Sequence, residues 1–210
     1  MTALIQFEHV TKKYGKKEAL NDISFTIEPG KIYGLLGPNG SGKSTTIKII
    51  NDLLQPTSGN VLVNGAAPGV ESKKIISYLP DRNYLSDWMR VEDSFKLFGD
   101  FYEDFDRQRA EEMLKSLNID EKARLKTLSK GTLEKVQLIL IMARRAKLYI
   151  LDEPIAGVDP AARDYILQTI LNNYGEDSSI LISTHLITDI EKILDEVLFI
   201  QNGKLVSRTR

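Results

Sequence analysis

The sequence GLLGPNGSGKST, residues 34–45, lies between an apolar run typical of a buried strand and the helical pattern KSTTIKIINDLL. Four of its residues match the phosphate-binding pattern G-x-x-x-x-G-K-[ST] at the required spacing, namely Gly37, Gly42, Lys43 and Ser44. A strand before the loop and a helix after it are the context in which this pattern binds phosphate. The stretch therefore predicts a phosphate-binding loop. The alternative is a glycine-rich turn that only caps a helix.

Each residue type in this loop has a physical role. Glycines allow the tight turn and let the backbone come close to phosphate oxygens. The backbone N–H groups from Asn39 to Thr45 are expected to point inward at the positive end of the helix. Lys43 is expected to reach the β- and γ-phosphates, and the Ser44 hydroxyl to complete a Mg²⁺ shell. The residues predicted to bind the nucleotide here are Gly37, Pro38, Asn39, Gly40, Ser41, Gly42, Lys43, Ser44 and Thr45.

A second apolar run, KLYILDEP (residues 147–154), ends in two carboxylates, Asp152 and Glu153. Open α/β sheets bind ligands at the carboxyl ends of their strands, so both side chains are expected at the nucleotide site. Asp152 is predicted to hold the metal through water, and Glu153 to take or orient the proton of the attacking water. The alternative is a strand that is followed by an acidic turn.

The run ISTHL (residues 182–186) ends the next strand in the same way and places His185 at the same edge of the sheet. There His185 is predicted to donate to the γ-phosphate and to sense whether that phosphate is present. The alternative is a histidine that is structural or merely exposed.

The composition restricts the class of protein. The chain has 210 residues and a formal net charge of −1, so no overall charge attracts it to nucleic acid or acidic lipid. It has no cysteine, which excludes disulfides and thiol catalysis, and its two histidines make a multi-histidine metal site improbable. No apolar run approaches the roughly 20 residues that span a bilayer, and the N-terminus lacks the basic and apolar regions of a signal peptide. These features predict a soluble intracellular domain.

The periodicity along the chain predicts an α/β fold. LIQFEHVTKKY alternates and predicts a strand, and EALNDISFTIEPGKIYGLLG predicts two more, which the turn Glu28-Pro29-Gly30 separates. The short strand TSGNVLVNG ends in the hairpin signal Asn64-Gly65. Residues 84–145 are almost entirely helical in pattern. Strand and helix then alternate, with helices predicted from Asp159 to Tyr174 and from Leu186 to Asp195, before a hairpin VLFI-QNG-KLV. We expect one domain over residues 1–210, with a mostly parallel sheet, an N-terminal antiparallel β lobe and a helical lobe at about 84–145.

These motifs, in this order, resemble those of the ATP-binding subunit of ABC transporters over essentially the whole chain. GPNGSGKST is similar to the Walker A loop of that family, YILDEP to its Walker B strand, and AGVD, which ends at Asp159, to its D-loop. His185 matches the switch histidine, and Tyr14 matches the aromatic residue that stacks on adenine. An ordinary tyrosine at a strand end is the alternative for Tyr14. The resemblance implies a P-loop NTPase core, a Mg²⁺-dependent ATPase that powers a membrane transporter, and ATP and Mg²⁺ as cofactors.

The sequence LSKGT, residues 128–132, occupies the place of the family signature LSGGQ. In that family two subunits pair head to tail, and each signature covers the nucleotide on the partner's P-loop. The resemblance therefore implies that Ser129, Lys130 and Gly131 face a γ-phosphate in trans, in a homodimer or a heterodimer with a paralogue. Removal of that phosphate by hydrolysis would open the dimer. The alternative is a structural helix that Ser129 caps.

The sequence departs from the family pattern at three positions. Lys130 and Thr132 replace the Gly and Gln of the signature, and Asp81 occupies the place of the glutamine of the Q-loop. Aspartate is charged and one methylene shorter than glutamine, so Asp81 is a predicted third metal-facing residue beside Ser44 and Asp152. These substitutions resemble those of bacterial exporter-type systems.

The partner expected from the resemblance is a separate transmembrane subunit, which would hold this chain at the cytoplasmic, inner face of the cell membrane. The aromatic segment around Trp88 matches the place where the family's helical lobe grips a helix of that subunit, although aromatics at helical spacing also form cores. No nucleic-acid partner is expected. The alternative function is a soluble or degenerate ABC-type regulatory protein without transport, whereas a GTPase is disfavoured because no N-K-x-D guanine reader is present.

Overall fold

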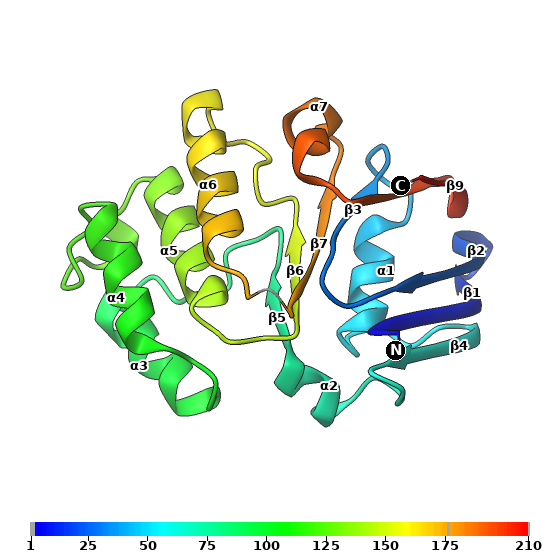
Figure 1. The fold of residues 1–210 in the computed structure, drawn as a ribbon, viewed down its shortest axis with the longest axis horizontal. Coiled ribbons are helices and arrows are strands. Elements are labelled where there is room, and N and C mark those ends of the chain that lie inside the picture. Colours follow the sequence, from blue (N-terminus) through cyan, green and yellow to red (C-terminus); the bar gives the residue numbers. More distant parts are fainter. Residues whose placement is uncertain (1–2, 176, 210) are drawn as a thin grey trace.

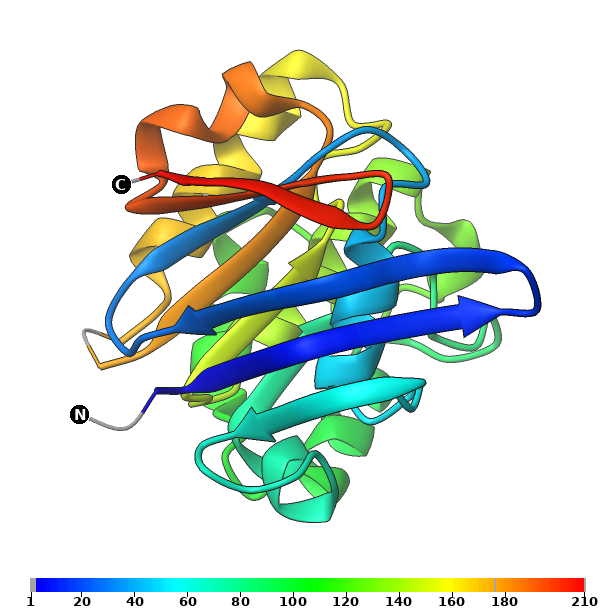
Figure 2. The ribbon, with the colours of Figure 1, turned by 90° about the vertical axis from the view of Figure 1, so that its right-hand side faces the viewer.

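The N-terminal part of the chain forms an antiparallel sheet. The structure is a computed structural model that describes residues 3–175 and 177–209. Three strands pair in the order β2-β1-β4 and lie side by side in Figure 2, namely β1 (Ile5–Tyr14), β2 (Lys17–Ile27) and β4 (Ser58–Val63). The predicted turn at Asn64-Gly65 is present, because both residues have positive φ and Val63 bridges to Ala66. The antiparallel lobe is thereby confirmed.

A second sheet carries the predicted parallel strands in the order β5-β6-β7-β3-β8-β9. Its strands are β3 (Ile32–Leu36), β5 (Ile76–Leu79), β6 (Leu148–Asp152), β7 (Ser179–Thr184), β8 (Glu196–Gln201) and β9 (Lys204–Thr209). All neighbouring pairs are parallel except β8 and β9, which form the predicted C-terminal hairpin. Every residue of β3, β6 and β7 is buried, as expected for parallel strands that are covered on both faces.

Helices cover both faces of the parallel sheet and complete the predicted α/β fold. Helix α1 (Lys43–Ile50) lies between the two sheets, as Figure 1 shows. On the other face lie α3 (Val91–Phe101), α4 (Arg107–Ser116), α5 (Lys130–Met142) and α6 (Pro160–Asn172). The alternation along β3 shows how one strand serves two cores. Tyr33 and Leu35 pack toward α1 and the antiparallel sheet, while Ile32 and Leu36 pack toward the helices.

Two buried charges join parts that are distant in the sequence. Arg144 is 3% exposed and donates to Asp104 at 2.8 Å, to the carbonyl of Ile76 at 2.6 Å, and stacks 3.9 Å from the Tyr102 ring centroid. These contacts tie the helical layer to strand β5. A buried charge lowers the stability of the fold unless it is fully paired. The connection between the helical layer and β5 therefore depends on all of these contacts of Arg144.

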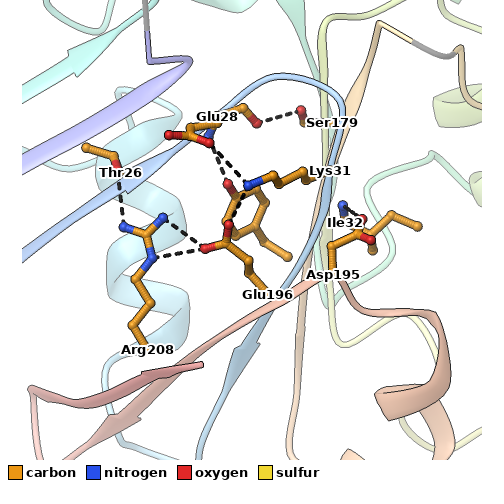
Figure 3. A network of polar contacts seen from close by, with 9 residues as sticks. Thr26, Glu28, Lys31, Ile32, Ser179, Asp195, Glu196 and Arg208 are labelled. Carbon is orange, nitrogen blue, oxygen red and sulfur yellow. Dashed lines mark hydrogen bonds and ion pairs between the residues drawn. The ribbon is translucent and has the colours of Figure 1, made fainter. Parts of the chain in front are cut away.

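The second buried charge is Glu196, the first residue of β8 (Figure 3). Its carboxylate accepts from Lys31 at 2.7 Å and from Arg208 at 3.0 Å. Burial raises the pKa of Glu196, but the hydrogen bonds from Lys31 and Arg208 outweigh burial and leave the pKa below its ordinary value. The network joins β8 and β9 to Lys31, the residue that directly precedes β3.

The structure corrects one element and adds three. The helix predicted from Leu186 to Asp195 is wrong in length, since α7 covers only Ile187–Ile190 before a 3₁₀ turn (η2, Glu191–Ile193). The chain leaves the helix early because Asp195 pairs with β3, accepting from the N–H of Ile32 at 2.8 Å and donating its own N–H to the Ile32 carbonyl at 2.9 Å. The added elements are α2 (Val70–Ile75), the 3₁₀ turn η1 (Leu125–Thr127) and the short strand β5.

Candidate functional site

The loop between β3 and α1 requires glycine at particular positions. Gly37 has φ of 155° and Gly42 has φ of 118°, and both values lie where residues with side chains are rare. A Cβ on Gly37 would lie 2.1 Å from the Ile200 carbonyl oxygen, and a Cβ on Gly42 would lie 2.9 Å from the Ala19 carbonyl oxygen. The spacing of the motif therefore reflects packing of the loop against β2 and β8 as well as its turn.

Lys43 lies at the centre of the site although it is only 5% exposed. Its ammonium donates to the carbonyls of Gly37 at 2.8 Å and Pro38 at 3.2 Å, and it lies 3.5 Å from Glu153 Oε1. Both carbonyls belong to the loop itself, so the loop holds the lysine side chain in place. A buried ammonium that loop carbonyls hold in place is suited to bind and stabilise a polyanion.

A cavity of about 230 Å³ lies at this loop, and Tyr14 is one of the residues that line it. The Tyr14 ring is half exposed, and the Lys12 ammonium lies 5.3 Å from the ring centroid. A flat, exposed ring in the wall of a cavity at the loop is the arrangement that base stacking needs. The cavity is lined by Tyr14, Lys17, Ala19, Asn39, Gly40, Gly42, Lys43, Ser44, Thr45 and Glu153.

Three residues of the predicted loop set do not line this cavity. Gly37 and Pro38 supply the carbonyls that hold Lys43. Ser41 is 3% exposed, and its carbonyl accepts from the N–H of Gly203 in the β8–β9 turn at 2.8 Å. These three residues therefore hold the loop and Lys43 in place and do not line the cavity.

Asp152 and Glu153 follow one another at the end of β6 but lie in different surroundings. Asp152 is 2% exposed, and burial raises its pKa, while hydrogen bonds from Ser183 and Ser44 act in the opposite direction. Glu153 has φ of 51°, in the left-handed region. Its Oε2 lies 3.0 Å from His185 Nδ1, and its Oε1 faces Lys43. The structure therefore brings Lys43, Glu153 and His185 into one chain of contacts.

The carboxylates also line a larger cavity, of about 360 Å³, between the sheet edge and α5. Asp81 enters it directly after β5, the strand that pairs with β6, and its charge further raises the pKa of Asp152. Among the described residues no group of three or more His, Cys, Asp or Glu side chains is arranged to hold a metal. Ser44 lines the smaller cavity and Asp152 the larger one. A hydroxyl and a carboxylate nevertheless fit Mg²⁺, which takes few protein oxygens and completes its shell with water and phosphate.

The comparisons with known proteins agree with this geometry. A family model described as ABC transporter matches residues 20–156. The chain is 31% identical to the linearmycin resistance ATP-binding protein LnrL of Bacillus subtilis strain 168, over 97% of this chain and 68% of LnrL. It is also 31% identical to the SkfA peptide export ATP-binding protein SkfE of the same organism, over 97% of this chain and 87% of SkfE.

A solved structure of the ATP-binding subunit of an ABC transporter matches with a TM-score of 0.89 and 27% identity. The match covers 98% of this chain and 89% of that one. This chain belongs to the ABC transporter family. It is an ATP-binding, ATP-hydrolysing subunit of that family, which confirms the fold and the ATPase function expected from the motifs.

In this ABC ATP-binding subunit, the signature residues begin helix α5. Ser129 caps the helix, since its Oγ accepts from the N–H of Thr132 at 3.2 Å. The Lys130 side chain is 78% exposed, yet it lines the larger cavity with Glu153 and lies 3.9 Å from Glu134. Gly131 has open space at its Cβ position. Asp159 is exposed just before α6 and lines neither cavity.

Several residues of the subunit's cavities were not predicted from the sequence. Lys17 and Ala19, both in β2, line the smaller cavity. Glu134 also lines the larger cavity and lies four residues, or one helical turn, after Lys130. This i, i+4 spacing is visible in the sequence and could have indicated that the two side chains lie close together. Ser183 follows three apolar residues of β7 and lies two positions before His185, and that position is the available signal. Arg82, Asn83 and Gln137 also line the larger cavity.

Proposed function

We propose that this ABC ATP-binding subunit hydrolyses Mg²⁺-bound ATP with Glu153 as the general base and His185 and Lys43 beside the γ-phosphate. The observation that carries the proposal is the contact chain from Lys43 to Glu153 at 3.5 Å and from Glu153 to His185 at 3.0 Å. A carboxylate that is held between two cationic or donor groups is placed to accept a proton from water next to the phosphate.

The loop residues bind and orient the nucleotide in this proposal. Backbone N–H groups from Asn39 to Thr45 surround the phosphates, Lys43 neutralises their charge, and Tyr14 stacks on adenine. Ser44, Asp152 and Asp81 would hold Mg²⁺, which supplies charge neutralisation at the phosphate oxygens. His185 donates a hydrogen bond to the γ-phosphate and so responds to its loss.

We further propose that two copies, or this chain and a paralogue, pair head to tail. Ser129, Lys130 and Gly131 then face the partner's γ-phosphate from the positive end of α5, and Asp159 lies at the junction. The capping contact of Ser129 is compatible with this role, because a hydroxyl can accept from its own helix and still donate outward.

We propose a transmembrane subunit of an exporter as the second partner. A third cavity, of about 310 Å³, is lined by Leu53, Tyr84 and Phe98 among others, and Trp88 and Phe101 nearby in sequence are 72% and 75% exposed. Exposed aromatic side chains are typical of contact surfaces. Across residues 3–175 and 177–209, no helix is both long and apolar enough to cross a bilayer. The transporter partner would then hold this one domain, residues 1–210 with the helical lobe at 84–145, at the inner face of the membrane.

A variant of Lys43 tests the proposal. Lys43→Ala should abolish Mg²⁺-dependent phosphate release, because it removes the charge that faces the transferred phosphoryl group. Phosphate release from purified protein measures this, with Lys48→Ala on the same helix as the matched control. Full activity in Lys43→Ala would refute the assignment of the site.

A further inference from the structure

Ser183 occupies a position from which one side chain reaches both acidic residues of the site. It is the fifth residue of β7, is 0% exposed, and lies directly opposite Asp152 in the parallel register of β6 and β7. In the strand sequence SILIST, the three residues before Ser183 are apolar, and the other two hydroxyl residues, Ser179 and Thr184, stand at the ends.

The contacts of Ser183 are complementary. Its hydroxyl donates to Asp152 Oδ1 at 2.5 Å and accepts from the backbone N–H of Glu153 at 3.1 Å. The carbonyl of Ser183 also accepts from that same N–H at 3.0 Å. A hydroxyl has one donor and two acceptor positions, so both contacts are satisfied together.

The second contact explains how Glu153 keeps its unusual backbone. Glu153 has φ of 51°, and residues with a side chain rarely adopt this left-handed conformation unless surrounding contacts impose it. The N–H of Glu153 is shared between two oxygens of Ser183. The left-handed turn directs the glutamate side chain toward Lys43 and His185 instead of along the strand.

We propose that Ser183 is a positioning residue for ATP hydrolysis, which orients the Asp152 carboxylate toward Mg²⁺ and holds the turn that directs Glu153 at the attacking water. This inference rests on the proposed function of Asp152 and Glu153. Partners that orient a metal-facing group from behind typically contribute about 10- to 100-fold in metal affinity or activity. Ser183 therefore acts through its two neighbours and does not itself touch the nucleotide.

The same strand offers a matched control. Ser179 is also 0% exposed, and its hydroxyl donates to the carbonyl of Glu28 at 3.1 Å, at the opposite end of β7 (Figure 3). Removal of this hydroxyl costs a hydrogen bond from a buried serine to a backbone carbonyl that is remote from the site. Because Ser179 lies far along the strand from Asp152, its loss should affect stability without affecting catalysis.

The experiment compares Ser183→Ala, Ser183→Cys and Ser179→Ala with the wild type. Cysteine keeps the approximate size of serine but is a weak donor and acceptor, so this variant separates the effect of the hydrogen bonds from the effect of packing. It also replaces the alanine variant in the comparison if that variant does not fold. Four quantities are measured, namely kcat, KM for ATP, the Mg²⁺ concentration at half-maximal rate, and the affinity for a fluorescent ATP analogue in Mg²⁺ and in EDTA.

We expect both Ser183 variants to lose about 10- to 100-fold in kcat and to need more Mg²⁺ for half-maximal rate. Their affinity for the analogue should fall in Mg²⁺ and stay unchanged in EDTA, because only the Mg²⁺-dependent part uses Asp152. Ser179→Ala should match the wild type in all four quantities. A Ser183→Cys variant with wild-type kcat and Mg²⁺ dependence would overturn the inference, as would equal losses in Ser183→Ala and Ser179→Ala. A wild type without Mg²⁺-dependent hydrolysis would instead overturn the proposed function on which the inference rests.

Discussion

At the scale of single residues, the site combines side chains whose charges are held close together. Lys43 and Glu153 are mostly buried and 3.5 Å apart, and His185 adds a third group at 3.0 Å from Glu153. Tyr14 differs from these residues, because it lines the smaller cavity with its ring half exposed. We therefore propose that the buried residues serve the phosphates and that Tyr14 serves the base.

Tyr14→Ala should weaken ATP binding by about 1–3 kcal/mol, the range found when a base loses an aromatic platform. Tyr14→Phe should keep the affinity, because stacking needs the ring and not the hydroxyl. Titration with a fluorescent ATP analogue measures both variants. An unchanged affinity in Tyr14→Ala would show that Tyr14 is an ordinary residue at the end of a strand.

At the scale of elements, buried ionic networks connect strands and helices whose apolar packing alone does not determine which elements pair. Arg144 joins Asp104 after α3 to the Ile76 carbonyl at β5. Glu196 joins β8 to Lys31 before β3 and to Arg208 in β9, as Figure 3 shows. Loss of one partner from such a network leaves an unpaired buried charge, which is strongly destabilising.

The Glu196 network predicts a pH dependence of stability. The pKa of Glu196 in the folded protein lies below the ordinary value of 4.5, so the folded state favours its ionised form. The resulting stabilisation is complete above that ordinary value and is lost as the pH falls through the lower folded pKa. Glu196→Gln should therefore lower the thermal midpoint at neutral pH, and the difference from wild type should shrink in acid.

Thermal unfolding of both proteins from neutral pH to about pH 3 measures this difference. Glu112→Gln, a change at an exposed position of α4, is the control and should leave the profile of the wild type unchanged. A Glu196→Gln variant whose deficit stays constant down to the lowest pH would contradict the prediction.

At the scale of the whole molecule, the two cavities differ in which of the predicted site residues line them. The smaller cavity contains the phosphate loop, Tyr14 and Glu153, while the larger one opens between Glu153 and the start of α5. Lys130 lines the larger cavity, yet its side chain is 78% exposed. This exposure leaves the start of α5 accessible to a partner subunit.

Glu153→Gln should keep the shape of the site and remove the carboxylate that prepares water, so that ATP binds and persists. This variant should form a dimer with ATP and a monomer with ADP in size exclusion coupled to light scattering. Ser129→Arg on the same background should block the dimer, because the larger side chain would fill the space for the partner's γ-phosphate. A monomer at saturating ATP, with and without the membrane subunit, would refute the head-to-tail mechanism.

Lys130→Gly on the Glu153→Gln background measures the contribution of the unusual lysine. If Lys130 contacts the partner's phosphate, as we expect, the ATP-bound dimer should weaken and become less sensitive to salt. The dissociation constant across a range of NaCl concentrations is the measurement. A change within roughly half a kcal/mol at all salt concentrations would assign Lys130 to solvent.

The sequence by itself determined the phosphate loop, the strands that end in Asp152, Glu153 and His185, and the division into a β lobe, a parallel sheet and helices. These features are local, because periodicity, glycine spacing and turn residues act over a few positions of the backbone. Only the tertiary structure decided the register that sets Ser183 against Asp152, and the short strand β5 that brings Asp81 to the same cavity. It also decided the early end of α7, because the Asp195–Ile32 pairing overrides the local helical pattern. Such choices depend on contacts between residues far apart in the chain, whose energy comes from burial and pairing that no short stretch of sequence contains.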